Sequence, residues 1–360
     1  MPPLQTLALQ LFRALGGFAL VRHLTRDRLR ILCYHGFSLG DEHEVAPMMF
    51  MRAETFERRM RILRRRRIPV VTLEEGVRRL TQHEVRHAET VITFDDGWAS
   101  NLAIGVPIAE KFGYPVSIYL TTEHLGASPE VFNVALAYMI RRSGKSMLTL
   151  AGVHPQIDGS YDLRTDPEAA IRAVITAVQK VLPLPERRKL LRPIATALGL
   201  DLEEVLKNGR FNLLTGSQIQ ELFSRGVDIQ LHTHSHRLPE EFEAAAGEIG
   251  RNRQALRELT GAEPRHFCYP SGIYHEQHPE WLARLGIISA TTCDPGFNDR
   301  DTSPLLLKRY LDSERISDLA FEAEICGVRE LARNVRAALA RVRNSRSAMT
   351  RRLRRGAAPP

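Results

Sequence analysis

Two short polar clusters, far apart in the chain, contain the residue types that bind a divalent metal ion. Asp95 and Asp96 lie within Thr-Phe-Asp-Asp-Gly, and His232 and His236 lie within His-Thr-His-Ser-His. One carboxylate and two imidazoles make a three-ligand site that leaves coordination positions open for water and substrate. The second carboxylate beside such a site is free to act as a base. The clusters therefore predict hydrolysis assisted by a metal ion.

Each cluster directly follows a short apolar run. Residues 91–94 precede the aspartates and residues 227–231 precede the histidines, and such runs are typical of buried strands. Side chains at the carboxyl ends of parallel strands converge on the catalytic mouth of α/β proteins. Because neighbouring residues on a strand point to opposite sides, Asp95 and Asp96 must lie where the strand bends into a loop. Gly97 permits that bend.

Amide hydrolysis is the reaction that these residue types suit. It needs a nucleophilic water molecule, a polarised carbonyl group and a proton for the departing amine. A bound cation such as zinc can lower the pKa of its water from 15.7 to about 7, and it also polarises the carbonyl oxygen. A carboxylate within hydrogen-bond reach of that water takes its proton. The two clusters supply both the metal ligands and the base that this reaction requires.

The clusters resemble the two main motifs of the polysaccharide deacetylase family, also known as the NodB-homology family or carbohydrate esterase family 4. The resemblance extends from about residue 30 to residue 312, and includes Cys-Tyr-His at 33–35 and Phe-Cys-Tyr-Pro-Ser-Gly at 267–272. It implies an α/β fold, a distorted (β/α)7–8 barrel, that uses a divalent metal to remove N-acetyl groups from chitin-like and other bacterial glycans.

The resemblance also assigns roles to individual residues. It implies that Asp95 is the general base and that Asp96 is a metal ligand. His232 and His236 are the other two implied ligands. The backbone N–H of Ser271 is the implied donor to the oxyanion, a role that does not depend on the identity of the side chain.

The general acid of the family is not evident in this chain. The family's Leu-x-His motif, which supplies the acid, corresponds to residues 305–310, and this stretch contains no histidine. His35 ends the first predicted strand, so we expect it to face the mouth and to donate the proton or contact the substrate. His275, or a water that shuttles the proton through Asp95, is an alternative. A core histidine bonded to the backbone is the competing explanation for His35.

The third motif departs from the family pattern as well. Many family members have an arginine that orients the catalytic aspartate, and Cys268 stands in its place here. Arg265, three residues earlier, is the candidate to replace it, with a solvated arginine at a strand end as the alternative. His234 lies between the two implied histidine ligands. We expect His234 to support the site rather than to bind the metal.

A barrel of alternating strands and helices is needed to position these residues. The apolar patterns predict strands at residues 30–34, 68–73, 91–94, 116–120, 227–231, 267–269 and 287–291. They predict helices around residues 56–67 and at residues 74–81, 104–112, 216–225 and 240–259. Residues from about 129 to 210 are expected to form a mainly helical insertion on the catalytic side. This insertion is either a lid or acceptor-binding element, or an elaboration of the packing.

The barrel, residues 30–312, leaves a head, residues 1–29, and a tail, residues 313–360. The leucines of the head fall on one helical face, which fits an amphipathic helix at a membrane surface better than a cleavable signal peptide or a spanning segment. Residues 329–360 contain ten arginines and one acid, a net charge of +9, whereas the whole chain carries +8. We expect residues 1–29 and 329–360 to bind anionic lipid, with a solvated tail as the alternative and nucleic acid less favoured. We expect the protein to be cytoplasmic or peripheral to the inner membrane.

The residue types favour Zn²⁺, although Co²⁺, Ni²⁺, Mn²⁺ and Fe²⁺ suit the same ligands. The four cysteines have no metal or redox spacing. The predicted reaction removes N-acetyl groups from amino sugars of a bacterial surface polysaccharide or its lipid-linked precursor. The alternatives are a deformylase or other deacylase of a lipid-linked amino sugar, and a catalytically inactive glycan-binding relative.

Overall fold

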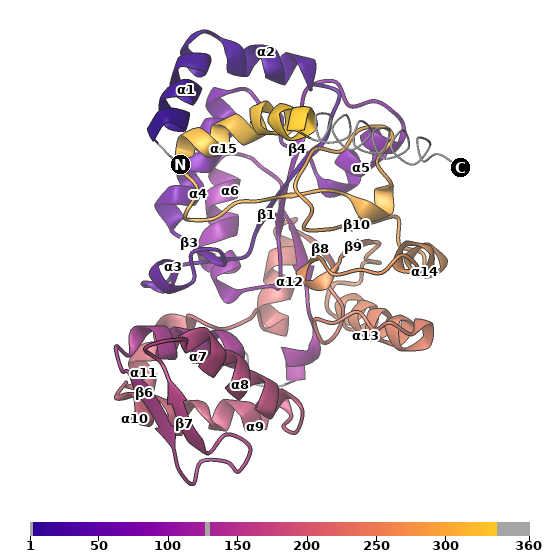
Figure 1. The fold of residues 1–360 in the computed structure, drawn as a ribbon. Helices are drawn as coiled ribbons and strands as arrows, with labels where there is room; N and C mark the ends of the chain where they lie inside the picture. Colours follow the sequence, from indigo (N-terminus) through magenta and orange to yellow (C-terminus); the bar gives the residue numbers. More distant parts are fainter. Residues whose placement is uncertain (1–2, 127–129, 337–360) are drawn as a thin grey trace, which may run out of the picture.

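One curled parallel sheet organises the molecule. The structure is a computed structural model, and it describes residues 3–126 and 130–336. Within these residues seven strands lie in the order β10-β9-β8-β5-β4-β1-β11 and form a half-barrel (Figure 1). They are β1 (Arg30–Tyr34), β4 (Thr90–Phe94), β5 (Ser117–Leu120), β8 (Asp228–Leu231), β9 (His266–Cys268), β10 (Ser289–Thr291) and β11 (Tyr310–Leu311). The expected barrel-like α/β fold is confirmed.

The central strands are buried along their whole length. Every residue of β1, β4 and β5 is buried, as expected for parallel strands that have helices on their faces. β4 pairs in parallel with β1 on one side and with β5 on the other. After Phe94 the chain leaves the sheet, and the Asp95 N–H donates to the Tyr34 carbonyl at 2.9 Å. Asp95 therefore stands at the carboxyl edge of the middle of the sheet.

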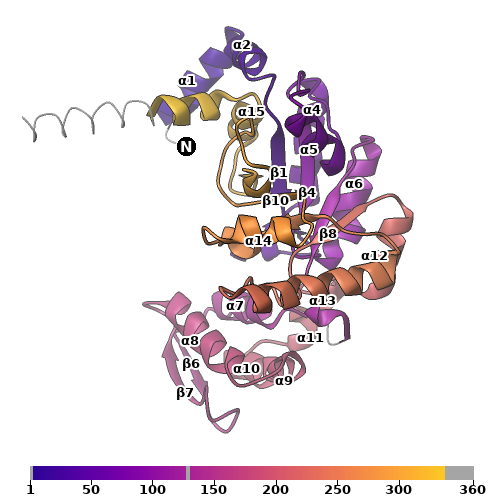
Figure 2. The ribbon, with the colours of Figure 1, turned by 90° about the vertical axis from the view of Figure 1, so that its right-hand side faces the viewer.

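Helices cover the sheet (Figures 1 and 2). They are α4 (Ala53–Arg65), α5 (Leu73–Thr81), α6 (Val106–Lys111), α12 (Gly216–Ser224), α13 (Phe242–Thr260), α14 (His278–Arg284) and α15 (Asp318–Ile325). Local sequence fixes where several of them begin and end. Thr215 and Gln218 form a capping box at the start of α12, and Gly261, with φ 72°, ends α13.

Residues 130–214 leave the barrel at its carboxyl edge and return to the same place. They contain α7 (Phe132–Arg142), β6 (Met147–Leu150), β7 (Gly159–Asp162), α8 (Pro167–Gln179), α9 (Leu184–Lys189), α10 (Leu191–Leu198) and α11 (Leu202–Val205). The outgoing and returning chains are joined by the Val131 N–H, which donates to the Phe211 carbonyl at 2.8 Å. This insertion has its own hydrophobic core, which also includes Phe50 and Trp98 of the barrel.

Three local expectations need correction. Residues 68–73 form no strand and make a single bridge, Val70 to Thr90, before α5 begins. The expected helix at residues 104–112 is a π-helix, Asn101–Gly105, followed by the short α6. The insertion contains the antiparallel hairpin of β6 and β7, which the sequence did not predict.

The first and last described segments of the chain meet at the amino edge of the sheet. The head forms α1 (Pro3–Ala14) and α2 (Gly17–Leu24), and residues 328–336 are helical. The Arg30 guanidinium at the start of β1 donates to the Ile325 carbonyl at 2.7 Å and to Thr25 Oγ1 at 2.8 Å. Among the described residues no single helix is long and apolar enough to span a membrane; the α1–α2 pair reaches that length only together, with a bend of 77°. Residues 337–360 of the predicted basic tail lie outside the described residues.

Candidate metal centre and active site

Asp96, His232 and His236 lie together at the carboxyl edge of the sheet. The Nε2 atoms of both histidines lie 3.3 Å from Asp96 Oδ1. One donor atom from each of the three residues lies within 4.8 Å of the other two, a spacing that can hold one metal ion. His232 is buried and His236 is half-exposed, so the group is anchored on one side and open to solvent on the other. The three sequence-predicted ligands are thus brought together.

Unusual backbone conformations bring these side chains together. Asp96 has φ 70° and Gly97 has φ 85°, so the chain reverses directly after β4. Thr233 and His236 also have positive φ, 62° and 58°, in the turn that follows β8. Non-glycine residues adopt this left-handed region at a cost in energy, and such residues concentrate at functional sites. The hydroxyl of Thr233 stabilises the turn by accepting the Arg237 N–H at 3.0 Å.

Hydrogen bonds from neighbouring elements hold the ligands in place. His232 Nδ1 lies 2.8 Å from the Cys268 carbonyl, which fixes the proton on Nδ1 and leaves Nε2 free to bind a metal ion. Asn252 of α13 accepts the His232 N–H at 3.0 Å. The Trp98 indole donates to Asp96 Oδ2 at 3.2 Å, and Trp98 belongs to the core of the insertion. The insertion therefore packs against a barrel residue that is hydrogen-bonded to Asp96.

Asp95 forms a buried ion pair with Arg309. The guanidinium donates from Nη1 to Oδ1 at 2.7 Å and from Nη2 to Oδ2 at 2.8 Å, and the Arg309 side chain is fully buried. Burial alone would raise the pKa of Asp95, but the charge and hydrogen bonds of Arg309 outweigh it and lower the pKa to about 2. Asp95 is therefore an ionised, rigidly oriented carboxylate at neutral pH.

Arg309 takes the place that the sequence suggested for Arg265. Arg265 precedes β9 at the amino edge, is half-exposed, and lies 3.5 Å from Glu74 rather than near Asp95. Arg309 directly precedes β11, within the stretch that replaces the family's Leu-x-His motif. Its Nη2 also lies 3.1 Å from Cys268 Sγ, so the small cysteine leaves room for a guanidinium that arrives from another strand. The sequence feature that could have indicated this role is the position of Arg309 inside an apolar, strand-like run.

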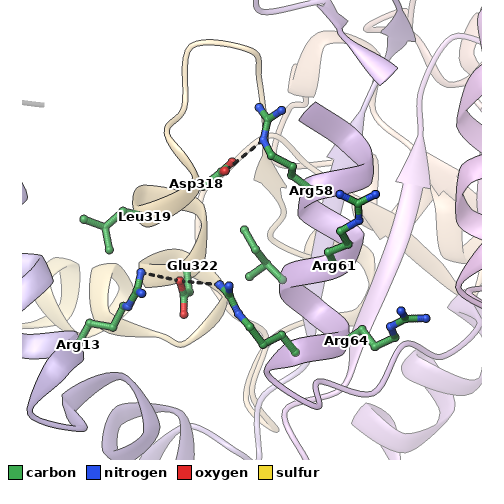
Figure 3. Close-up of a pocket in the computed structure, with 9 residues that line it drawn as sticks. Arg13, Arg58, Arg61, Arg64, Asp318, Leu319 and Glu322 are labelled. Carbon is green, nitrogen blue, oxygen red and sulfur yellow. Dashed lines mark hydrogen bonds and ion pairs between the residues drawn. The ribbon is translucent and has the colours of Figure 1, made fainter. Parts of the chain in front are cut away.

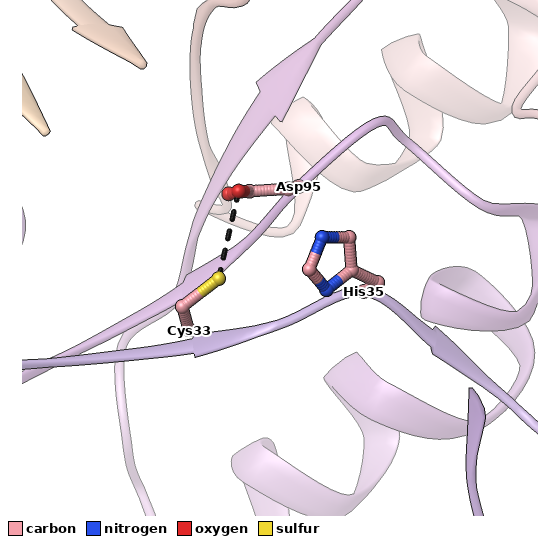
Figure 4. A group of neighbouring side chains, drawn as sticks. All are labelled: Cys33, His35 and Asp95. Atoms are coloured by element: carbon pink, nitrogen blue, oxygen red, sulfur yellow. Dashed lines mark hydrogen bonds between the residues drawn. The ribbon is translucent and has the colours of Figure 1, made fainter. Parts of the chain in front are cut away.

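His35 lies at the mouth, as the sequence predicted. It follows β1, and its imidazole has a nitrogen within 4.8 Å of donor atoms of Asp95 and Cys33 (Figure 4). The thiols of Cys33 and Cys268 each lie 3.5 Å from Asp95 Oδ2. His35 is partly exposed, whereas both thiols are buried. His35 can therefore reach both the carboxylate and a molecule in the mouth.

The remaining predicted residues have distinct positions. Ser271 has φ 56° in the turn Pro270–Gly272, and its N–H has no acceptor among the described residues. His234 Nδ1 lies 3.0 Å from Thr122 Oγ1, so His234 joins two loops, as expected of a supporting residue. His275 pairs with Glu240 at 3.3 Å, outside the group of metal-ligating residues. This contact gives His275 no role near Asp95.

A cleft of about 450 Å³ opens beside the metal-ligating residues. On the barrel side it is lined by Asp96, Trp98, His234 and His236, and on the insertion side by Asn133, Gln179 and Arg187, among others. The Arg237 guanidinium reaches across to Gln179 Oε1 at 3.3 Å. The insertion therefore forms one wall of the cleft that leads to the site.

The half-barrel is the fold of NodB-type deacetylases, hydrolases that act on amide bonds. Residues 205–289 match the family model for polysaccharide deacetylase. This match, which covers part of the chain, confirms the predicted resemblance to that family. The comparison with curated proteins found no match.

Solved structures of deacetylases share the fold. The Streptococcus pyogenes deacetylase PplD, in complex with acetate, has a TM-score of 0.55 at 15% identity, over 83% of this chain and 98% of its own. IcaB from Ammonifex degensii has a TM-score of 0.53 at 17% identity, and the match covers 83% of this chain and 97% of IcaB. A de-N-acetylase from Aggregatibacter actinomycetemcomitans has a TM-score of 0.52 at 12% identity, and the match covers 82% of this chain and 98% of that protein.

Proposed function

We propose that this protein removes N-acetyl groups from amino sugars of a bacterial surface glycan, with one divalent metal ion, most simply Zn²⁺, as cofactor. The observation that carries the proposal is the ionised Asp95–Arg309 pair beside the Asp96, His232 and His236 group. A binding protein has no need of a buried carboxylate that is kept ionised next to metal ligands. Amide hydrolysis needs one, as the base.

The donor set fits a zinc-type ion. Asp96, His232 and His236 would hold it, with the His232 tautomer already set by the Cys268 carbonyl. When bound, the ion would supply Lewis-acid polarisation of the amide carbonyl and make water more acidic. Asp95, whose pKa is about 2, is too weak a base to deprotonate ordinary water. Its role as the base therefore depends on the ion, which would make the water more acidic.

The other residues of the mouth would complete the reaction. Asp95, held by Arg309, accepts the proton of the attacking water. The Ser271 N–H donates to the oxygen on which negative charge develops. His35 delivers a proton to the departing nitrogen, in place of the missing Leu-x-His histidine, because its imidazole borders Asp95 and is partly exposed. The amine and acetate then leave through the cleft beside the insertion.

The first test compares wild type with Asp95→Asn and a His232→Ala/His236→Ala double variant. We expect about one ion per chain in wild type and Asp95→Asn, and none in the double variant. Acetate release from N-acetylated oligosaccharides should fall at least a hundredfold in both variants. Activity of Asp95→Asn within a few-fold of wild type would show that Asp95 is not the base. Faster release of formate from an N-formylated analogue would favour a deformylase instead.

We also propose that the protein attaches to a membrane surface. The exposed leucines of α1 and the arginines of residues 329–336 are the described parts of the two segments that the sequence assigned to anionic lipid. We infer a peripheral attachment through these segments at the inner membrane. Co-sedimentation of the full chain with vesicles that contain phosphatidylglycerol tests it, and absence of binding would contradict it.

A further inference from the structure

A cleft of about 600 Å³ lies between α1, α4 and α15, away from the catalytic mouth (Figure 3). Arginines dominate its lining: Arg13 comes from α1, and Arg58, Arg61, Arg64 and Arg65 come from α4. The acids in the lining are Asp318 and Glu322, both on α15. We call this feature the arginine cleft. Its composition suits an anion better than a neutral ligand.

Both acids of the arginine cleft are already neutralised. Glu322 is buried and lies 3.4 Å from both Arg13 Nη1 and Arg65 Nη2. Asp318 lies 3.1 Å from Arg58 Nε. Arg61 pairs with Glu57 at 2.9 Å outside the lining. The five arginines still outnumber these three acids, so the lining keeps an excess of positive charge. Guanidinium groups bind phosphate through paired, charge-assisted hydrogen bonds, so a phosphate group is the ligand that this cleft fits.

An exposed apolar surface adjoins the arginine cleft. It consists of the leucines at positions 4, 7, 11 and 15 around α1 and at positions 20 and 24 on α2, and we call it the leucine face. Leu4 is 81% exposed and Leu15 is 85% exposed. The opposite side of α1 faces the barrel, where Leu9 packs against the core and Arg13 contacts Glu322. An apolar face bordered by arginines is typical of a helix that lies in a lipid interface.

The charges decide between a lipid surface and a second copy of the chain as the partner. Pairing two leucine faces would bring two arginine clefts together, and like charges repel across an interface. Residues 328–336 emerge at the same edge, where Arg28 pairs with Glu330 at 3.7 Å, and they lead into the strongly basic end of the chain. Charge complementarity therefore favours an anionic lipid surface.

The position of these features in the barrel sets an orientation. Thr25, directly after α2, and Ile325 of α15 both accept hydrogen bonds from Arg30 at the amino end of β1. Asp95 and His232, in contrast, follow the carboxyl ends of β4 and β8. A five-residue strand spans roughly 17 Å. The leucine face and the catalytic mouth therefore lie at opposite ends of the barrel, and the insertion marks the far end (Figure 1).

We propose that the leucine face and the arginine cleft dock the protein on an anionic membrane, with lipid phosphate groups in the cleft, so that the catalytic mouth opens away from the bilayer. This inference rests on the membrane contact proposed above and deepens it. It assigns the substrate as a glycan segment that extends at least ~15 Å from the lipid headgroups, since the barrel separates the two ends. A sugar linked directly to a lipid headgroup does not reach the mouth in this orientation.

The test measures binding of the full chain to vesicles of phosphatidylcholine with and without phosphatidylglycerol. Leu7→Ser/Leu11→Ser removes part of the leucine face, and Arg61→Gln/Arg65→Gln removes two of the five positive charges that line the cleft. The matched control is Arg172→Gln/Arg192→Gln, two arginines on the insertion that are each 68% exposed. We expect affinity for phosphatidylglycerol vesicles to fall at least fivefold in both test variants and to stay within twofold in the control.

Hydrogen–deuterium exchange on the same vesicles tests the orientation. We expect new protection in residues 4–28 and 58–67, and none in residues 121–125 or 232–238. Protection at the mouth would overturn the orientation. Unchanged affinity in both test variants would assign binding to the basic end of the chain alone and overturn the docking site. If Leu7→Ser/Leu11→Ser turns a dimer into a monomer without loss of vesicle binding, the leucine face joins two copies instead.

Hydrolysis of a soluble N-acetylated oligosaccharide separates this inference from the proposed function. The test variants change no residue near the mouth, so we expect wild-type rates in solution for all of them. If no form of the protein hydrolyses the oligosaccharide while vesicle binding behaves as expected, the proposed reaction fails and the docking surface stands. If hydrolysis proceeds but wild type does not bind vesicles, the docking surface fails and the reaction stands.

Discussion

Cys268 and Arg309 explain together how Asp95 is held. A guanidinium from the segment before β11 fills the space beside a small thiol, where the family pattern has an arginine on the neighbouring motif. The buried pair gives Asp95 a fixed direction as well as a charge. Because both partners are buried, removing either one leaves an uncompensated charge, which costs about 3–5 kcal/mol.

Replacing Arg309 should make the ionised form of Asp95 less stable. In Arg309→Met the burial that raises the pKa of Asp95 is no longer opposed by a cation. The pKa of Asp95 should therefore rise. As a result, kcat/KM of the variant should fall at acid pH values at which kcat/KM of wild type is unchanged. Arg309→Lys keeps the positive charge without the paired geometry, so its shift should be smaller. The measurement is a pH profile of kcat/KM at saturating metal, above pH 4.

Arg265→Met is the matched control, because the sequence favoured Arg265 for the same role. Its contact with half-exposed Glu74 lies at the other edge of the sheet, so its profile should match wild type. A shift in Arg265→Met, or none in Arg309→Met, would contradict the assignment.

The residues of the two motifs were predictable because each motif is a short continuous segment. Asp95 and Asp96 adjoin each other, and His232 and His236 share one turn. Arg309 was not predictable in the same way, since its partner is far away in sequence and β11 contains only two residues. Which arginine reaches a buried carboxylate depends on the strand order, which residue patterns do not specify.

At the scale of elements, His124 fastens the insertion to the barrel. It lies in the loop after β5, and its Nε2 is 3.0 Å from the carbonyl of Leu214, which ends the returning chain. The Leu214 N–H donates in turn to the Gly97 carbonyl at 2.8 Å. Burial is the main cause that lowers the pKa of His124 to about 4. The bond across the base of the insertion is therefore made by a neutral imidazole.

Acid should consequently weaken the protein through His124. Between its ordinary pKa of about 6.5 and its folded pKa of about 4, the unfolded chain binds a proton that the folded chain does not. This contribution to the free energy of unfolding is complete at neutral pH and is lost as the pH falls through that window. It amounts to roughly 2 kcal/mol between pH 7 and pH 5.

Urea denaturation with a chelator present, at pH 7 and pH 5, measures this contribution. His124→Gln keeps an N–H donor for the Leu214 carbonyl but has no titrating group. Between pH 7 and pH 5 the variant should therefore lose about 2 kcal/mol less free energy of unfolding than wild type. Equal losses in wild type and His124→Gln would exclude His124 as the acid-sensitive group.

Sequence patterns located most elements and missed those that depend on pairing. The buried runs at β1, β4, β5 and β8 were found because their apolar character is continuous. The hairpin of β6 and β7 was missed, because β7 has no buried residue and its conformation comes from its partner. Residues 68–73 were overpredicted, because this stretch joins the sheet only through the bridge from Val70 to Thr90.

At the scale of the whole molecule, the metal ligands join distant parts of the chain. Asp96 follows β4, whereas His232 and His236 follow β8, with β5 and the insertion between them in sequence. An ion that binds all three residues can do so only in the folded protein. Metal binding should therefore stabilise the fold by mass action, by about 4 kcal/mol when free ion exceeds Kd ~1,000-fold.

Thermal unfolding with and without a chelator tests this coupling. We expect the chelator to lower the Tm of wild type by several degrees and to leave that of His232→Ala/His236→Ala unchanged. Asp95→Asn keeps all three ligands and should respond like wild type. A Tm of wild type that is insensitive to both chelator and added zinc would mean that the three residues do not bind an ion.

The closeness of the insertion's two ends has a consequence for how the chain folds. Val131 bonds to Phe211, so residues 132–210 form a loop whose ends touch. The entropy of closing a loop grows only logarithmically with its length, so adding or removing a helix there changes the closure cost by less than about 1 kcal/mol. The barrel strands can therefore assemble without waiting for the insertion, which has a core of its own. In evolution this segment can change length and shape freely, and the wall of the substrate cleft can change with it.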